Sequence, residues 1–363
     1  MEQFLIMIKE IGIENFRCFG TSTFSGFHQV NLIGGKNNVG KTSFLEALHL
    51  SHSPQVLTLM QMRGTDKEIL KAAPEKAWEN IFFNQDQNAI VTLRSVCENN
   101  VANLLELFTP SKKDLLKIIF ESECVDEQQK LSDLVLHSKD AAFSVLNLVA
   151  HETGKHAVPL FSLVAHSEGV WVKTNKIPEH INFKKIGFIS NSTSVTNRSL
   201  AEQYDRCFMQ GHADKIKAAF QLIDPSIVDV NTLSIGKPAV YLTKDNGKTF
   251  PLSLFGEALS RIANMVLQLI DNQNGILLID EIENGIHDTK RKDLWRMLFK
   301  LSIQFNIQIF ATTHSFSMQQ VFNEVLEEQE NIGCFFEFTR HIKTHQVTSI
   351  RYNKGSLEYG LKR

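Results

Sequence analysis

The chain has 363 residues, of which 43% are hydrophobic and 21% are charged, proportions that are ordinary for a folded globular protein. Its 38 Lys and Arg residues face 40 Asp and Glu residues, so the net charge of −2 excludes a protein that is basic as a whole, and a nucleic-acid surface must be a local patch. No stretch reaches 18 apolar residues, which argues against a membrane partner and favours a soluble, cytoplasmic protein.

The first half of the chain predicts strands around a single well-defined helix. Residues 6–35 contain apolar residues broken by polar ones and predict β-strands, and residues 42–50 have apolar side chains at helical spacing. From about residue 89 to residue 175, short apolar runs separated by turn residues predict an antiparallel meander. The runs are "AIVTLRSV", "LLKIIF", "FSVLNLVA", "VPLFSLVA" and "GVWVKT".

In the second half, apolar strands alternate with helices. Residues 199–222 and 256–271 predict helices, and Asp245-Asn246-Gly247 predicts a hairpin turn between two apolar runs. The runs "GILLID" and "IQIFAT" bracket a helix of about 15 residues, for which Asp288 is the expected N-cap. A strand, a crossover helix and a second strand form a βαβ unit, so we expect a parallel sheet that is covered on both faces.

The segment "NLIGGKNNVGKTSFLEAL" carries a phosphate-binding loop. Gly35, Gly40, Lys41 and Thr42 have the spacing of a Walker A motif, between an apolar strand and a helix. Glycines in such a loop let backbone N–H groups face phosphate oxygens, and the helix N-terminus adds partial positive charge. We expect Lys41 to reach the β- and γ-phosphates of ATP and the Thr42 hydroxyl to bind Mg²⁺. The other predicted nucleotide-binding residues of this segment are Asn37, Asn38, Val39 and Ser43.

The later apolar run Ile276–Ile279 is followed directly by two carboxylates, Asp280 and Glu281. Burying negative charge without a partner is costly, so a cation is expected near them. In a P-loop fold, an apolar strand beside the P-loop strand ends in an Asp that binds the Mg²⁺ of the nucleotide, and Asp280 fits this role. Glu281 should face a different direction and polarise the attacking water. A capped strand end on the surface is the alternative.

Two further segments indicate the class of P-loop protein. "IQIFATTHS" ends near His314, about 34 residues after Asp280, at the place of the histidine that senses the γ-phosphate in ABC-type ATPases. "PLSLFGEALSR" lies about 24 residues before Asp280, and its Ser253 and Gly256 could present a hydroxyl and a helix N-terminus to a γ-phosphate. The predicted catalytic residues are therefore Lys41, Glu281 and His314.

The order of these segments resembles the ABC-ATPase superfamily. More narrowly, "IGIENFRCFG" and "IDEIENGIH" are similar to the branch that contains RecF, SMC heads and the OLD and Septu-type ATPases of prokaryotic defence systems. The resemblance implies that Arg17 lies close to the base or ribose of ATP. It also implies a glutamine after the first strands of the β-lobe, for which Gln85 and Gln87 are both candidates. Ala258 and Ile282 depart from the usual Gly and Pro, which favours slow hydrolysis.

This resemblance implies an α/β P-loop NTPase fold of the ABC type. It would have a mixed or parallel sheet core, an inserted antiparallel β-lobe and a helical segment. We expect a single domain over residues 1–363: residues 1–90 would hold the first strands, the P-loop and the following helices, residues 90–185 the β-lobe, and residues 186–363 the signature, the acidic strand and the switch histidine.

By the same resemblance, two chains would dimerise head to tail around ATP, or form a higher homo-oligomer. Ser253 and Gly256 would then complete the site of the partner, and Glu283 and Asn284 would lie near that partner. No long coiled coil interrupts the sequence, and the 49 residues after His314 are too few for the Toprim nuclease of OLD proteins. We therefore expect a slow ATPase that acts as sensor or scaffold for a separate nuclease or toxin in anti-phage defence.

Three other functions fit parts of the pattern. A RecF-like ATPase of DNA repair would bind nucleic acid directly, and it is the main alternative. The ATPase subunit of a transporter would be expected to carry a more regular signature than "LSLFGEA". A metabolic P-loop kinase is disfavoured by the acidic pair and the later histidine.

Overall fold

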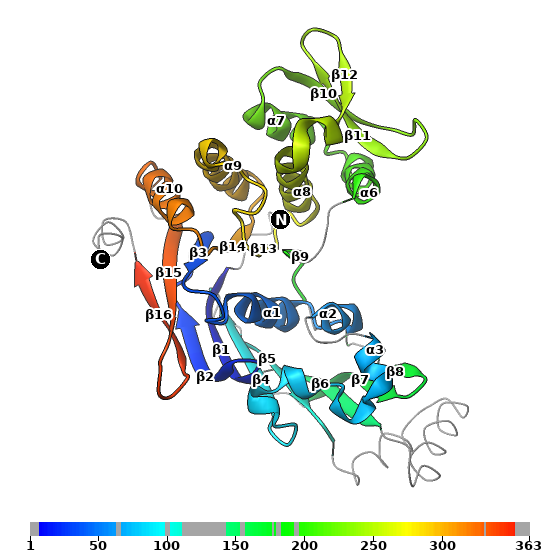
Figure 1. Cartoon of the computed structure of the whole chain (residues 1–363), viewed down its shortest axis with the longest axis vertical. Helices are drawn as coiled ribbons and strands as arrows, with labels where there is room; N and C mark the ends of the chain where they lie inside the picture. The colour runs from blue at the N-terminus through cyan, green and yellow to red at the C-terminus, as the bar shows by residue number, and fades with distance from the viewer. Residues whose placement is uncertain are drawn as a thin grey trace.

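The computed structural model describes residues 7–62, 67–98, 102–110, 143–152, 157–175, 178, 183–191, 196–329 and 332–352. These residues form layers, with a six-stranded sheet across the middle, a group of helices on one face of it, and a helix and a second sheet on the other (Figure 1). No helix in the described ranges is long and apolar enough to cross a membrane.

The central sheet contains the two apolar runs that were expected to be parallel strands. They are β13 and β14, which pair in parallel and are buried along their whole length, so the predicted βαβ unit is confirmed. The strand order is β16-β15-β3-β14-β13-β9, and the pair β15–β16 is antiparallel. The strands are β3 (Val30–Gly34), β9 (Ile186–Ile189), β13 (Ile276–Ile279), β14 (Gln308–Thr312), β15 (Gly333–Arg340) and β16 (Val347–Tyr352).

We expected the strand before Asp280, β13, to run directly beside the P-loop strand β3, and this expectation is wrong. β14 lies between β3 and β13 and pairs in parallel with both. The carboxyl ends of the three strands still lie at one edge of the sheet, because all three run in the same direction. Side chains that follow β3, β13 and β14 can therefore meet.

The second sheet has seven strands and is antiparallel throughout. Its order is β2-β1-β4-β5-β6-β7-β8, so the predicted meander continues a sheet that begins with the first two strands of the chain. The predicted run "LLKIIF", residues 115–120, lies outside the described residues. The strands are β1 (Ile8–Phe16), β2 (Phe19–Ser25), β4 (Val91–Cys97), β5 (Ala102–Phe108), β6 (Ser144–Glu152), β7 (Val158–His166) and β8 (Gly169–Thr174).

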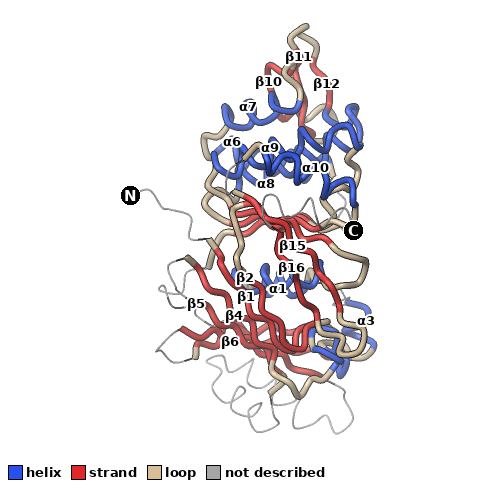
Figure 2. The backbone as a smooth tube through the Cα atoms, turned by 90° about the vertical axis from the view of Figure 1, so that its left-hand side faces the viewer, coloured by secondary structure: helices blue, strands red, loops and turns tan. Residues whose placement is uncertain are grey.

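Helix α1 (Lys41–His52), which follows the P-loop, lies between the two sheets (Figure 2). Ten of its 12 residues are buried, as expected for a helix that is covered on opposite sides. Phe44 joins the layers, because its ring lies 5.1 Å from that of Phe24 on β2 and 6.3 Å from that of Phe310 on β14. The helix that carries the Walker residues is therefore fixed in the core.

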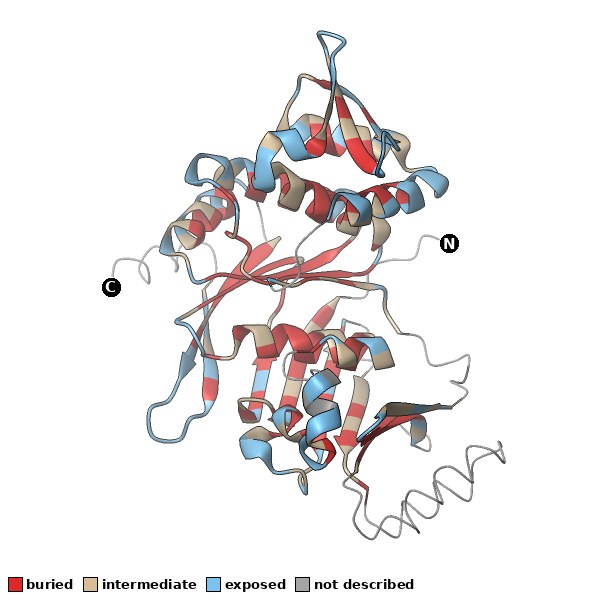
Figure 3. Ribbon diagram, turned by 45° about the vertical axis from the view of Figure 1, so that its right-hand side comes forward, coloured by how far each residue is buried: buried red, intermediate tan, exposed pale blue. Residues whose placement is uncertain are grey.

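The helices on the other face of the central sheet bury their apolar sides against it (Figure 3). The helices α6, α7 and α8 lie beside a small antiparallel sheet, in which Gly247 (φ 75°) forms the predicted hairpin turn. The elements are α6 (Asn197–Met209), α7 (Ala213–Ile223), β10 (Ile227–Leu233), β11 (Ala239–Lys244), β12 (Thr249–Pro251), η4 (Leu252–Phe255), α8 (Gly256–Asp271), η5 (Asp288–Lys290), α9 (Arg291–Gln304) and α10 (Phe316–Glu327).

The expected N-cap of the crossover helix is wrong. Asp288 opens the short 3-10 turn η5, and α9 begins only at Arg291 with Lys290 as its N-cap residue. Asp288 instead forms an ion pair with Arg291, at 2.6 Å.

Short helical segments connect α1 to β4: α2 (Val56–Met60), α3 (Lys67–Ala72), η1 (Pro74–Lys76), η2 (Glu79–Ile81) and η3 (Phe83–Gln85).

Candidate nucleotide-binding and catalytic site

The predicted P-loop connects β3 to α1 through backbone conformations that favour glycine. Gly35 has φ 133° and Gly40 has φ 100°, and Asn38 between them has φ 62°. A Cβ atom on Gly35 would lie 2.5 Å from the carbonyl oxygen of Phe338, and one on Gly40 would lie 2.7 Å from Cys18 Sγ. Both positions therefore require glycine: a side chain would strain the backbone at these φ values, and its Cβ atom would clash with Phe338 or Cys18.

Lys41 folds back over this loop. Its Nζ donates to the carbonyl oxygens of Gly35 at 2.8 Å and Lys36 at 2.9 Å, and the residue is only 8% exposed. Burial lowers the pKa of Lys41, and the carboxylates of Glu283, Asp280 and Glu281 act in the opposite direction. The ammonium is thus placed among the three acidic side chains that follow β13.

The ends of α1, β13 and β14 bring three oxygen-bearing side chains together. The Thr42 hydroxyl donates to both carboxylate oxygens of Asp280, at 3.2 and 3.0 Å, and the Thr312 hydroxyl donates to Asp280 Oδ1 at 2.6 Å. Asp280 is 4% exposed. Mg²⁺ prefers oxygen ligands and is commonly bound by one or two carboxylates together with phosphates, so the Thr42 and Asp280 oxygens fit this ion.

Glu281 points away from Asp280 because its backbone is left-handed, with φ 48°. Its amide donates to the Thr312 hydroxyl at 2.9 Å. Its Oε2 accepts hydrogen bonds from the side-chain amides of Asn191 at 2.5 Å and Asn284 at 2.7 Å. The predicted general base is thus oriented by two amides, and those two amides also contact each other.

Asn191 is a functional candidate that the sequence did not reveal. It follows β9, the strand next to β13, and the two strands run parallel, so the residues after them meet. The family resemblance made Gln85 and Gln87 the two candidates for a glutamine after the first strands of the β-lobe. Gln85 instead bonds to Asn80, and Gln87 donates to the carbonyl of Glu75 at 3.2 Å. A polar residue directly after an apolar strand was the only signal that could have pointed to Asn191.

His314 lies after β14, and its ring Nδ1 is 2.9 Å from Glu283 Oε1. Glu283 is 7% exposed and contacts His314 of its own chain, and the expectation that Glu283 and Asn284 lie near a partner stays a prediction. Arg261 on α8 completes this cluster, because its Nη2 donates to the carbonyl oxygens of Asp280 at 2.9 Å and Glu281 at 2.8 Å. Burial lowers the pKa of Arg261, against the effect of the three carboxylates.

Ser253 and Gly256 do not join this cluster. Both are exposed at the start of α8, and no hydrogen bond connects either to the P-loop or to the carboxylates in the described part of the chain. Gly256 has φ 85°, and a Cβ atom there would meet nothing within 4 Å. The neighbouring Leu254 is 72% exposed. This segment therefore lies on the surface of the molecule, as a contact with a second chain would require.

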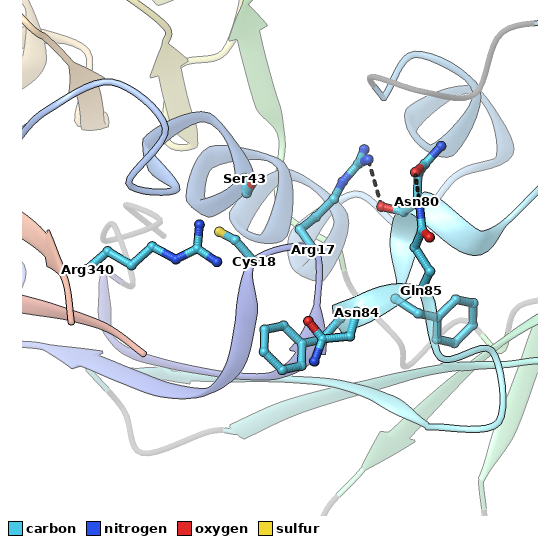
Figure 4. A pocket seen from close by; sticks show the side chains of 9 residues that line it. Arg17, Cys18, Ser43, Asn80, Asn84, Gln85 and Arg340 are labelled. Atoms are coloured by element: carbon cyan, nitrogen blue, oxygen red, sulfur yellow. Dashed lines mark hydrogen bonds between the residues drawn. The ribbon is translucent and has the colours of Figure 1, made fainter. Parts of the chain in front are cut away.

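A pocket of about 440 Å³ lies beside the P-loop helix and is lined by Arg17, with Ser43 and Gln85 on other walls (Figure 4). Arg17 does not extend freely into it: its Nη1 donates to the carbonyl of Asn80 at 2.9 Å, and its Nε lies 3.2 Å from Glu46 Oε2. The other lining residues are Cys18, Asn80, Phe82, Phe83, Asn84 and Arg340. The pocket is polar and aromatic at once, which suits a base or ribose.

Replacing Arg17 should therefore affect stability as well as any nucleotide contact. Arg17→Ala removes the cation from a pair in which the Arg17 side chain is 11% and the Glu46 side chain 3% exposed. Breaking a buried pair from one side typically costs about 3 kcal/mol or more, so urea unfolding should show a loss of that size. Glu46→Gln in the Arg17→Ala background should restore part of it. A loss below about 0.5 kcal/mol would show that the pair contributes little.

Known proteins match this chain over most of its length. Residues 30–317 match the family described as "AAA domain, putative AbiEii toxin, Type IV TA system". A curated relative from Helicobacter pylori, named "ATP/GTP phosphatase", is 24% identical over 351 residues, with 89% of this chain and 90% of the relative covered.

Solved structures of SMC heads are similar at low sequence identity. The SMC head domain from Thermotoga maritima has a TM-score of 0.45 and 10% identity, with 96% of this chain and 100% of that chain covered. An Smc head bound to the C-winged helix domain of ScpA has a TM-score of 0.47 and 11% identity, with 98% and 99% covered.

Proposed function

The chain belongs to the AAA-domain family that it matches over residues 30–317, and from that premise we propose that it is a Mg²⁺-dependent ATPase that controls a separate effector protein. It is a P-loop ATPase of the ABC type in its fold. One observation carries the site assignment: the Thr42 hydroxyl and both Asp280 carboxylate oxygens lie within 3.2 Å of each other. These residues are 238 positions apart in the sequence, and together they form the oxygen-rich pair that a nucleotide-bound Mg²⁺ requires.

Each remaining residue has a distinct role in this proposal. When bound, Mg²⁺ neutralises charge on the phosphates and favours departure of the leaving group. Lys41 binds the β- and γ-phosphates, exchanging its two P-loop carbonyl acceptors for phosphate oxygens. Glu281 accepts a proton from the attacking water, with its Oε2 held by Asn191 and Asn284. His314 contacts the γ-phosphate.

The site is completed by a second copy of the chain. Ser253 and Gly256 are exposed: Gly256 begins α8, the helix whose Arg261 reaches the acidic strand end, and Ser253 lies in the 3-10 turn η4 directly before it. A hydroxyl and a helix N-terminus on the surface are suited to meet the γ-phosphate of a partner chain. ATP would then stabilise a homodimer or a higher homo-oligomer, and hydrolysis would release it.

We assign the output of this switch to a second polypeptide, a nuclease or toxin in anti-phage defence. The words "putative AbiEii toxin, Type IV TA system" in the family description support a toxin-related context. The segments "IGIENFRCFG" and "IDEIENGIH" support a place near the OLD-like and Septu-type ATPases. Pull-down of the tagged chain from its native host, with ATP and with ADP, tests this part. The expected result is one partner protein retained in only one nucleotide state.

The first experiment measures phosphate release from ATP and from GTP, because the curated relative is named for both. We expect slow turnover of ATP that requires Mg²⁺ and stops with EDTA. Sedimentation velocity with ATP and Mg²⁺ should show a dimer or larger species that reverts after hydrolysis. A protein that neither hydrolyses nucleotide nor changes its oligomeric state would contradict the proposal.

Ser253→Ala should separate binding from turnover. Removing one donor to the transferred phosphate typically lowers kcat by about 100-fold, whereas ATP binding to the isolated chain should be unchanged. Stopped-flow binding of a fluorescent ATP analogue and steady-state hydrolysis measure the two effects. Equal loss of binding and turnover would place Ser253 in the site of its own chain. Ser260→Ala is a matched control, because the Ser260 hydroxyl donates within its own helix, to the carbonyl of Gly256.

A further inference from the structure

Glu283 makes a set of contacts that the roles above leave unexplained. Its Oε1 accepts hydrogen bonds from the backbone amides of His314 at 2.9 Å and Ser315 at 3.2 Å. The same oxygen lies 2.9 Å from His314 Nδ1. One carboxylate oxygen thus accepts from the backbone of the predicted switch histidine and lies beside its ring.

The position of Glu283 follows from the turn after β13. The left-handed backbone of Glu281 reverses the chain, and the amide of Ile282 donates to the carbonyl of Thr312 at 3.0 Å. This bond ties the turn to the end of β14, only two residues before His314. Ser315 then caps α10 by accepting from the amide of Met318 at 3.3 Å. Glu283 therefore connects the acidic turn to the start of α10.

The carboxylate is buried in a cluster that supplies positive charge. Its side chain is 6% exposed, and burial of a carboxylate requires partners. The negative charge of Glu283 raises the pKa of Lys41 and of Arg261, against the effect of their burial. For both groups this effect is larger than that of Asp280 or Glu281. The second oxygen, Oε2, is buried and accepts no hydrogen bond from the residues the structure describes. Glu283 thus contacts the predicted switch histidine and also acts electrostatically on the P-loop lysine.

The contact also bears on which ring nitrogen of His314 is available to a ligand. A carboxylate only accepts hydrogen bonds, so the 2.9 Å approach of Nδ1 to Glu283 Oε1 favours a proton on Nδ1. Nε2 is then directed away from Glu283, and the His314 side chain is 44% exposed. A ring held in this way keeps one tautomer and one orientation, as ligand histidines do when a carboxylate accepts their other N–H.

We propose that Glu283 is a positioning residue for His314, which holds the ring by Nδ1 and directs Nε2 toward the γ-phosphate of bound ATP. This inference rests on the proposed function, because it assigns His314 to the phosphate. It adds that the third acidic residue of "DEIE" acts within its own chain, through the histidine and not through Mg²⁺ or water. Loss of Glu283 and loss of His314 should then remove the same contribution to turnover.

A double-mutant cycle tests this coupling. Glu283→Gln retains an oxygen acceptor of similar size but removes the charge, and we expect kcat to fall by about 10- to 100-fold with little change in KM for ATP. His314→Ala should lower kcat by a similar factor, and the double variant should be no slower than the slower single variant. Glu324→Gln, on the exposed side of α10 where Glu324 pairs with Lys292, is the matched control with unchanged kcat.

Multiplicative effects in the double variant, or a Glu283→Gln variant with wild-type kcat, would overturn the assignment. A second readout, proton NMR, does not depend on turnover. The resonance of the proton on His314 Nδ1 is assigned by its loss in His314→Ala. This resonance should move upfield or broaden in Glu283→Gln. If the wild-type chain hydrolyses no nucleotide, the proposed function fails, and this signal still decides the pairing. An unchanged signal overturns the positioning role in either case.

Discussion

Lys41→Ala is expected to abolish ATP hydrolysis by removing ATP binding. Lys41 is buried, and its ammonium donates to the carbonyl oxygens of Gly35 and Lys36 in the P-loop. Loss of one partner of a buried, charged hydrogen bond costs about 2–5 kcal/mol, which corresponds to an affinity about 30- to 4,000-fold weaker. Equilibrium binding of a fluorescent ATP analogue measures this loss.

The control for Lys41→Ala is Lys300→Ala, which removes an exposed lysine from α9, away from the P-loop. It should bind ATP with wild-type affinity. Thermal unfolding should show that Lys41→Ala remains folded, because the apolar residues of α1, Phe44 among them, stay buried in the core. A Lys41→Ala variant with wild-type affinity would remove this loop from the nucleotide site.

Glu281→Gln is expected to leave ATP binding intact and to lower kcat by about 100- to 10,000-fold, the usual contribution of a general base. The amide keeps the size of the carboxylate, and its oxygen can still accept from Asn191 and Asn284. Only the ability to take a proton from water is lost. The variant should therefore accumulate bound ATP, measured by single-turnover quench and by chromatography of the retained nucleotide.

The two variants have opposite signatures, and this difference separates binding from chemistry. Lys41→Ala should lose nucleotide and stay monomeric, whereas Glu281→Gln should retain ATP and accumulate as the ATP-bound oligomer. Asp280→Asn provides a third comparison, since its effect should depend on Mg²⁺ concentration. Glu281→Gln with unchanged turnover would show that another group activates the water.

Much of the site could be predicted because its parts follow apolar strands. β3, β13 and β14 are short strands that are buried along their whole length, and such strands are parallel when helices connect them. Parallel strands place their carboxyl ends together, which is why Thr42 and Asp280 meet across 238 positions. The strand order itself, with β14 between β3 and β13, is not encoded in the spacing of any motif.

The details that the sequence did not give are set by backbone turns and by long-range pairing. Glu283 faces inward because Glu281 has φ 48°, a conformation that no residue pattern near it specifies. Asn191 reaches Glu281 only because β9 pairs with β13, and each pair of residues in that pairing is 90 positions apart in the chain. β1 and β2 belong to the same sheet as β4 to β8, a pairing that an apparent insert concealed.

The central claim is that one active site is built from two chains, and a mixing experiment tests it most directly. Glu281→Gln lacks the general base but keeps Ser253, and Ser253→Glu keeps the base but presents a negative charge where the partner's phosphate would lie. Each variant alone should be nearly inactive. Mixed in equal amounts with ATP and Mg²⁺, they should recover hydrolysis, because one of the two sites in a mixed dimer has every residue intact. A mixture no faster than the sum of the two separate variants would contradict the claim.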